Sequence, residues 1–282
     1  MEPSPLTNRA AEAESPTLLV TTSHKARAET VTRAMAFAVE HGYEFASRGD
    51  DSVDTLLTTA DAALVMTNDG GMSLATDHGV LKAHLGTAFI RLKSMSRGEG
   101  DPLVRAGEIQ PGDHVVDTTF GLGRDAIVAA CAVGASGAVT ALESSNALFH
   151  LGRYGTEVGP LSPSEVSNIG ERLTPAQIDV VNEPAIPWLK AAESASVDVI
   201  LVDPMFGEPK TADPGFELLR SVADDSPLTQ DWIEQACQVA RRWVVVKTGQ
   251  APDWLESMGA ERVHSHSNAT WWRVAGGQQG RP

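Results

Sequence analysis

Cysteine, basic residues and long hydrophobic segments are all scarce in this chain. Its two cysteines, Cys131 and Cys237, lie in apolar surroundings without a CxxC or Cys/His spacing, which argues against a disulfide framework or a metal site. Lys and Arg number 22 against 37 Asp and Glu, a net charge of −15 that excludes generic adhesion to nucleic acids or anionic membranes. No apolar run approaches the roughly 18 residues of a membrane span. We therefore expect a cytoplasmic protein with no metal and no membrane attachment.

The length and composition predict one large domain or two modest ones. The chain has 282 residues with 42% hydrophobic content, enough to bury a sizeable core. Residues 1–16 are rich in Pro, Ser, Glu and Ala without periodicity and are predicted to be a flexible tail, as is the end of the chain at 277–282. Between them we expect an N-terminal α/β module with a connector over 17–105 and a larger domain over 106–276.

The N-terminal module is expected to contain short elements. The sequence predicts strands over 17–22, 62–66 and 72–76, and helices over 25–40 and 53–59. The longer helix has Val31, Met35 and Val39 on one face and ends at Gly42, a residue typical of helix C-termini.

A local basic segment interrupts the acidic chain between residues 82 and 105. It carries five basic and two acidic residues. A solvated connector is one explanation for such a charge run. RNA binding is the other, because Arg is suited to phosphate contacts. The candidate RNA contacts are Arg91, Lys93 and Arg97.

From residue 114 onward, strands and helices alternate. Near-continuous apolar strands are expected over 114–117, 139–143, 179–182, 197–203 and 243–247, followed by a final pair over 262–265 and 271–275. Such alternation is typical of a parallel sheet covered on both faces, and the last two strands suggest a terminal antiparallel hairpin. The fold class predicted is α/β, with a Rossmann-like seven-stranded sheet and a small N-terminal α/β module.

A glycine turn follows the first of these strands. Asp117 ends the strand, and Gly121 and Gly123 precede an Ala-rich helix. The run from Gly121 to Ala126 also fits the dinucleotide fingerprint G-x-G-x-x-A, with Glu143 about 20 residues further on. In dinucleotide folds, however, the first glycine follows the strand almost at once. An acid four residues before the glycine pair instead resembles the methyltransferase version of this turn, which implies a ligand with an amino acid moiety whose ammonium group benefits from nearby carboxylates.

A second motif, Asp203-Pro204-Met205-Phe206, follows the buried run 199–202. It resembles the Asp/Asn-Pro-Pro-Tyr/Phe signature of class I S-adenosylmethionine (SAM)-dependent methyltransferases that act on planar amino groups. An amine conjugated to a ring is a poor nucleophile, so hydrogen-bond acceptors must draw on its N–H bonds. Asp203 and the Pro204 carbonyl are suited to that role, and Phe206 to stacking on a base.

Together the motifs resemble the RsmJ (YhiQ) family of 16S ribosomal RNA guanine-N2 methyltransferases and its uncharacterised bacterial relatives. The similarity rests on VVDTTFGLGRDA, VDVILVDPMF and RWVVVK, and extends upstream through ALVMTNDGGMSLAT. It implies SAM as the cofactor, ribosomal RNA as the substrate and guanine N2 as the methylated atom.

The resemblance also implies roles for individual residues. Arg124 and Asp125 would contact SAM at the turn, Glu143 would bind the ribose, and Asn182 and Glu183 would hold the adenine. Asp203 would close the cofactor site and face the target amine. Lys247, at the end of a strand, would point toward the rim of the same pocket, on the side where the substrate binds. Ser144 stands at the cofactor site where the family has an arginine.

Two other functions remain open at this point. One is an NAD(P)-dependent oxidoreductase with a Rossmann fold, and the other is a non-catalytic scaffold that keeps the cofactor fold.

Overall fold

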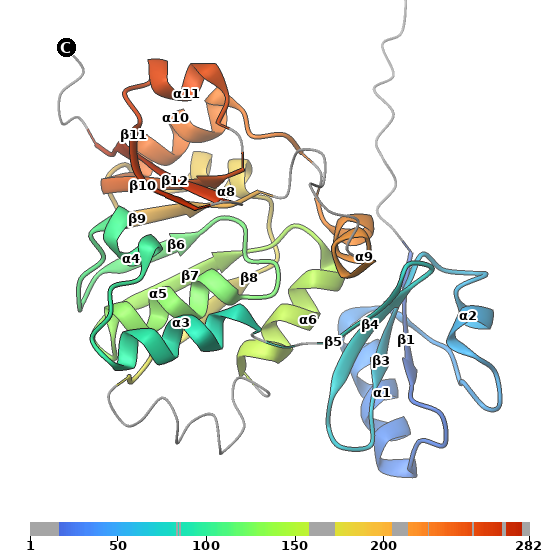
Figure 1. The fold of residues 1–282 in the computed structure, drawn as a ribbon. Coiled ribbons are helices and arrows are strands. Elements are labelled where there is room, and N and C mark those ends of the chain that lie inside the picture. The colour runs from blue at the N-terminus through green and yellow to red at the C-terminus, as the bar shows by residue number, and fades with distance from the viewer. Residues whose placement is uncertain are drawn as a thin grey trace, which may run out of the picture.

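Two β-sheets organise the described part of the chain. The computed structural model describes residues 17–82, 84, 86–157, 173–204, 214–224, 226–249, 251–266 and 269–277. A five-stranded sheet belongs to the N-terminal part and a seven-stranded sheet to the remainder (Figure 1). Within these ranges, none of the helices combines the length and apolar character needed to cross a membrane. The tail predicted over 1–16 lies outside the described residues, as does its C-terminal counterpart from 278 onward.

The five-stranded sheet has the strand order β2-β1-β3-β4-β5. Its strands are β1 (Leu18–Thr22), β2 (Glu44–Phe45), β3 (Ala62–Met66), β4 (Met72–Thr76) and β5 (Gly79–Lys82). β1 runs parallel to β2 and β3, whereas β4 and β5 form antiparallel pairs. Helices α1 (Ala28–His41) and α2 (Val53–Leu56) pack on opposite faces of the sheet. The predicted strands are confirmed, and β2 and β5 are additional.

Helix α1 is present, but its buried face differs from the apolar face read in the sequence. Met35 and Val39 are 50% and 83% exposed. The helix instead buries Thr30, Ala34 and Ala38 against the sheet. Small side chains at this face let the helix approach the sheet closely, so size rather than hydrophobicity decides which face is buried. The helix ends as predicted, with Gly42 in the left-handed conformation at φ 71°.

The seven-stranded sheet has the strand order β11-β12-β10-β9-β6-β7-β8. Its strands are β6 (His114–Asp117), β7 (Ala138–Leu142), β8 (Ile178–Val181), β9 (Val197–Val202), β10 (Ala240–Thr248), β11 (Glu261–His266) and β12 (Ala269–Ala275). Strands β6 to β10 are parallel, and β12 is antiparallel to β10 and β11. The predicted sheet, with its terminal hairpin, is confirmed.

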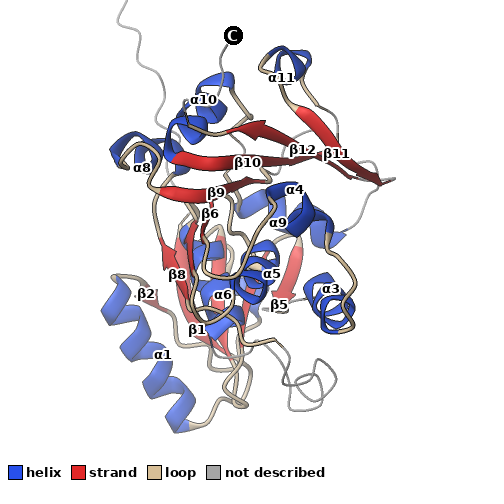
Figure 2. Cartoon of the chain, turned by 90° about the vertical axis from the view of Figure 1, so that its left-hand side faces the viewer, coloured by secondary structure: helices blue, strands red, loops and turns tan. Residues whose placement is uncertain are grey.

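Helices cover both faces of this sheet (Figure 2). On one face pack α3 (Thr87–Ser96), α4 (Pro102–Gly107) and α5 (Arg124–Val133), and on the other α8 (Ala185–Ala191), α10 (Gln230–Val239) and α11 (Asp253–Ser257). Apolar residues of each parallel strand alternate between the two cores, as a sheet buried on both faces requires. Helices α6 (Asn146–Glu157) and α9 (Pro214–Val222) lie toward the five-stranded sheet (Figure 1).

Helices α3 and α4 occupy the segment that the sequence suggested to be a connector. Their buried residues Leu92, Leu103 and Ala106 belong to the same core as α5. Asp101 caps α4, because its carboxylate accepts hydrogen bonds from the amides of Leu103 (2.9 Å) and Val104 (3.4 Å). Helix α4 therefore spans the predicted domain boundary between 105 and 106, and this segment packs with the seven-stranded sheet.

Candidate functional site

The glycine turn between β6 and α5 has a backbone that only glycine adopts easily. Gly121 and Gly123 have φ angles of 53° and 73°. A Cβ atom on Gly123 would lie 2.8 Å from the Phe120 ring and would also meet the Thr156 methyl group. The turn is thus held against α6, which carries Thr156.

Helix α6 makes a second close contact with the turn through Gly152. A Cβ atom there would overlap the Gly121 carbonyl oxygen and the Phe120 ring. This contact could not be predicted from the sequence, because Gly152 lies mid-helix and far from the motif along the chain.

Asp117 ends β6, and only one oxygen of its buried carboxylate accepts hydrogen bonds from the described residues. Its Oδ1 accepts hydrogen bonds from the Thr119 amide (3.0 Å) and hydroxyl (3.3 Å). Its Oδ2 is buried and has no hydrogen-bond partner among the described residues. Burial, reinforced by the nearby carboxylates of Asp125 and Asp203, raises the pKa of Asp117 to about 7. A buried acceptor without a partner is costly, so this oxygen is suited to a cationic ligand group.

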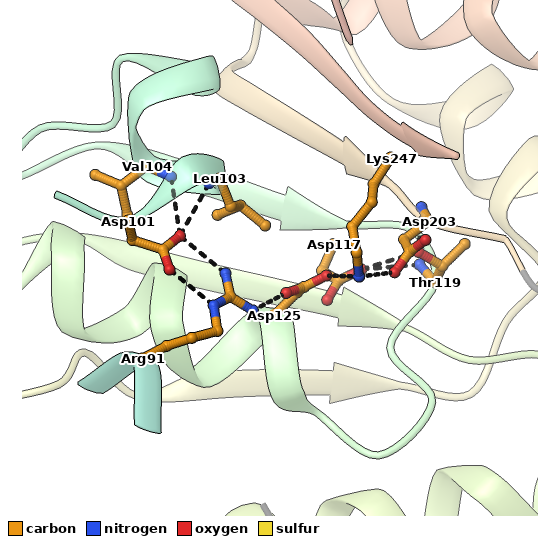
Figure 3. A network of polar contacts seen from close by, with 9 residues as sticks. All are labelled: Arg91, Asp101, Leu103, Val104, Asp117, Thr119, Asp125, Asp203 and Lys247. Carbon is orange, nitrogen blue, oxygen red and sulfur yellow. Dashed lines mark hydrogen bonds and ion pairs between the residues drawn. The ribbon is translucent and has the colours of Figure 1, made fainter. Parts of the chain in front are cut away.

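A chain of ion pairs lies near Asp117, across the ends of the strands (Figure 3). Lys247, near the end of β10, pairs with Asp203 and, at 3.3 Å, with Asp125. Arg91 of α3 pairs with Asp125 from the other side and binds Asp101 through two hydrogen bonds of 2.8 and 2.9 Å. The network links α3 and α4 to the carboxyl ends of β9 and β10.

The charges in this network shift one another's ionisation. Burial alone would raise the pKa of Asp125, but Lys247 and Arg91 outweigh it, and the pKa is lowered. For Lys247, burial lowers the pKa, yet the two carboxylates more than compensate and raise it. Burial raises the pKa of Asp203 to about 6, with Lys247 opposing the rise and Asp125 adding to it. Burial and Lys247 thus act in opposite directions on the ionisation of Asp203.

A cleft of about 570 Å³, counting its open mouth, lies at the carboxyl ends of β6, β7 and β9, where ligands bind in α/β sheets. Thr119, Glu143, Asp203 and Pro204 are among its lining residues. The remaining lining residues are Thr118, Gly121, Leu142, Ser144, Leu148, Ala185, Leu219, Ala223, Asp224, Ser226 and Trp232. The structure thus brings both sequence motifs to one cleft.

Glu143 lies at the inner wall of the cleft and supports the turn. Its carboxylate accepts hydrogen bonds from the amides of Gly121 (2.8 Å) and Ser145 (2.9 Å). Burial raises the pKa of Glu143 to about 7, although these hydrogen bonds oppose the rise. The Asn182 side chain donates to the Glu143 carbonyl oxygen at 2.8 Å.

Several residues expected at the site lie elsewhere or make other contacts. Asn182 and Glu183 are exposed and are not among the lining residues. Arg124 is exposed beside Gly86, on the side of α3. The predicted stacking residue Phe206 lies outside the described residues.

The expected RNA contacts divide into two kinds. The Arg91 guanidinium is already paired with two carboxylates and keeps only 21% of its side-chain surface exposed, so the phosphate contact expected of it is not supported. Lys93 is half-buried and Arg97 is exposed at the end of α3. Only Lys93 and Arg97 thus retain accessible surface for a phosphate.

Among the lining residues that were not recognised in the sequence, three have polar groups that bear on the site. Thr119 accepts a hydrogen bond from the Asp203 amide through its hydroxyl at 2.8 Å and so ties the two motifs together. Asp224, after α9, accepts a 3.0 Å hydrogen bond from Ser144, the residue that replaces the arginine of the family. Trp232 has a buried indole N–H without a partner among the described residues. Asp224 and Trp232 come from segments without a motif, so only the fold reveals them.

Comparison with known proteins identifies the family. A family model described as "Putative SAM-dependent methyltransferase" matches residues 50–270. The chain belongs to this SAM-dependent methyltransferase family. It is 33% identical to the "Uncharacterized protein YpiP" of Bacillus subtilis over 230 residues, which are 81% of this chain and 88% of the relative.

Two further relatives are informative. Ribosomal RNA small subunit methyltransferase J of Laribacter hongkongensis is 32% identical over 180 residues, which cover 60% of this chain and 59% of the relative. The crystal structure of a SAM-dependent methyltransferase from Neisseria gonorrhoeae superposes with a TM-score of 0.55 at 17% identity, covering 93% of this chain and 97% of that chain. The latter likeness supports the class I methyltransferase fold.

The cofactor of this methyltransferase is SAM, and the ion-pair network that reaches the cleft at Asp203 fits it. SAM carries two positive groups, a sulfonium and an ammonium. Four carboxylates, those of Asp101, Asp117, Asp125 and Asp203, surround only two cationic side chains, Arg91 and Lys247 (Figure 3). The unpartnered oxygen of Asp117 lies within this excess of negative charge. Because the chain belongs to this methyltransferase family, the alternative of an NAD(P)-dependent oxidoreductase is excluded.

Proposed function

We propose that this methyltransferase modifies an exocyclic amine of a nucleobase, guanine N2 in ribosomal RNA. The observation that carries the proposal is the position of Asp203. Its carboxylate lies at the carboxyl end of β9 and lines the cleft next to Pro204, with 35% of the side-chain surface still exposed. One carboxylate is thus available at the cleft for a substrate N–H group.

The surrounding contacts suit Asp203 to accept that hydrogen bond. Lys247 holds one carboxylate oxygen, and Thr119 fixes the Asp203 backbone. Because Lys247 favours the charged form of Asp203, the side chain is mostly an acceptor at neutral pH. The Pro204 carbonyl and the Phe206 ring are proposed as the second acceptor and the stacking surface.

The chemistry is a direct displacement. SAM supplies a methyl group bonded to a positively charged sulfur. The substrate nitrogen would take that methyl group as the sulfur leaves with the C–S electron pair, and Asp203 or water would accept the proton that the nitrogen then has to lose. Asp203 draws electron density toward the nitrogen by accepting its N–H, and the cleft holds the reactants in line. No covalent link to the protein is involved.

RNA is favoured as the substrate by the relative that is named a ribosomal RNA methyltransferase. Lys93 and Arg97 are proposed as phosphate contacts, because Arg91 serves the buried network instead. This function would place the protein in the cytoplasm.

Methyl transfer in vitro tests the proposal. The purified chain, given SAM with a labelled methyl group and ribosomal RNA that lacks this modification, should transfer label to guanine. The Asp203→Asn variant should lose most of the transfer while it still binds SAM in isothermal titration calorimetry. Transfer by Asp203→Asn at the wild-type rate would remove Asp203 from the mechanism. Absence of transfer by the wild-type chain to any ribosomal RNA would favour the scaffold alternative.

A further inference from the structure

The N-terminal module, residues 17–82, has one sheet face that is built into the rest of the protein. On its far face, the sheet packs against α2 and the following Leu57. On its near face, Leu64 and Leu74 share a core with Leu151 of α6 and Leu218 of α9. Figure 1 shows α6 and α9 next to this sheet. The near face is therefore an internal surface of the whole molecule.

The same two helices form part of the cofactor cleft. Leu148 of α6 and Leu219 of α9 line it. Leu122, from the glycine turn, belongs to the core that includes the near face of the module. Helix α6 also presses on the turn through Gly152, which leaves no room for a side chain beside the Gly121 carbonyl. One helix thus touches the module on one side and the cofactor turn on the other.

Directional contacts fix α6 to the module. The Tyr43 hydroxyl is hydrogen-bonded to Nε2 of His150 at 3.0 Å. The Phe37 ring packs edge-on against His150, with ring centroids 5.0 Å apart. His150 is 6% exposed and lies two residues before Gly152. The Tyr154 hydroxyl donates to the Gly70 carbonyl oxygen. These contacts set both the position and the rotation of α6.

We propose that the N-terminal module is a positioning element for the cofactor site, and that Phe37 and Tyr43 act through α6 on the glycine turn. The turn has little freedom on the side of α6, because a Cβ atom added at Gly123 or Gly152 would lie less than 3.0 Å from atoms of the turn or of α6. A small rotation of α6 therefore displaces the backbone that faces SAM. This role depends on the cofactor of the family and not on the identity of the methylated base, so it goes beyond the proposed function.

The test measures SAM affinity by isothermal titration calorimetry on the full chain, well below the unfolding transition of each variant. Tyr43→Phe removes one hydroxyl, and Phe37→Ala removes the ring that packs on His150. Leu57→Ala is the matched control, because it removes an apolar, half-buried side chain from the far face of the same sheet. Thermal unfolding is recorded for all three.

Tyr43→Phe and Phe37→Ala should weaken SAM binding by about two- to thirtyfold, the range for changes that act through intervening packing. Phe37→Leu, which keeps apolar bulk, should restore most of the affinity. Leu57→Ala should lower the unfolding temperature while its SAM affinity stays at the wild-type value.

Two outcomes would overturn the proposal. One is wild-type affinity in both near-face variants. The other is an affinity loss in Leu57→Ala that matches the loss in Phe37→Ala, because SAM binding would then follow overall stability. If Phe37→Ala does not fold, Tyr43→Phe takes its place in both comparisons: wild-type affinity in Tyr43→Phe, or an equal loss in Leu57→Ala, overturns the proposal.

Discussion

Replacing Lys247 by Met tests how the ion-pair network prepares Asp203. Methionine keeps the apolar part of the lysine side chain but removes the ammonium group that pairs with Asp203 and Asp125. With a pKa of about 6, about nine in ten Asp203 side chains are ionised at pH 7. An opposite charge at this range lowers a carboxylate pKa by about 1–3 units. Without Lys247 the ionised fraction at pH 7 should thus fall about two- to a hundredfold.

The assay is the pH dependence of kcat/KM for methyl transfer. The acid limb of the Lys247→Met profile should move upward by about 1–3 pH units, and activity should recover as the pH rises toward 9–10. Lys190→Met is the matched control, because Lys190 forms an exposed ion pair with Asp231 on the surface; its profile should match the wild type. An acid limb that stays in place, with activity lowered equally at every pH, would refute the role of Lys247 in keeping Asp203 ionised.

Three further variants test the cofactor turn and its support. Asp117→Asn should weaken SAM binding about tenfold in calorimetry, because a charged hydrogen bond is lost; full affinity would contradict the assignment. The pKa of Asp117 is raised from 3.8 to about 7 in the fold, so its contribution to stability is lost as the pH rises through that window, and Asp117→Asn should flatten this dependence in denaturant unfolding. Among the described residues, Arg91→Met leaves the buried Asp101 carboxylate without its cationic partner and Asp125 with Lys247 alone, and it should lower the free energy of unfolding by about 3 kcal/mol; a change within about 0.5 kcal/mol would indicate that the pair contributes no more than an exposed ion pair. Gly123→Ala places a side chain at φ 73° against Thr156 and should reduce both SAM affinity and the unfolding temperature. Wild-type values of both would show that the turn can accommodate a side chain at this position.

The parallel sheet and its motifs could be predicted because they depend on local patterns. Buried strands such as Val197–Val202 are nearly continuous apolar runs, and a glycine turn that follows a strand has a characteristic spacing. Because parallel strands end at one edge of a sheet, Asp117 and Asp203 were expected to lie together. The structure places their strands, β6 and β9, side by side.

The support of the site could not be predicted, because it depends on pairs far apart in sequence. Arg91 lies in a basic segment that suggested RNA binding, yet its partner Asp125 is 34 residues away. Gly152 shows its function only when α6 is placed on the turn. The buried face of α1 uses alanines rather than Met35 and Val39, since periodicity records hydrophobicity and not the space between packed elements.

Nucleoside mass spectrometry of ribosomal RNA, from cells with and without this gene, tests the central claim most directly. Loss of one N2-methylguanosine from small-subunit RNA, with restoration by the wild-type chain and not by Asp203→Asn, is the predicted result. An unchanged profile of methylated guanosines and adenosines would contradict a ribosomal RNA substrate.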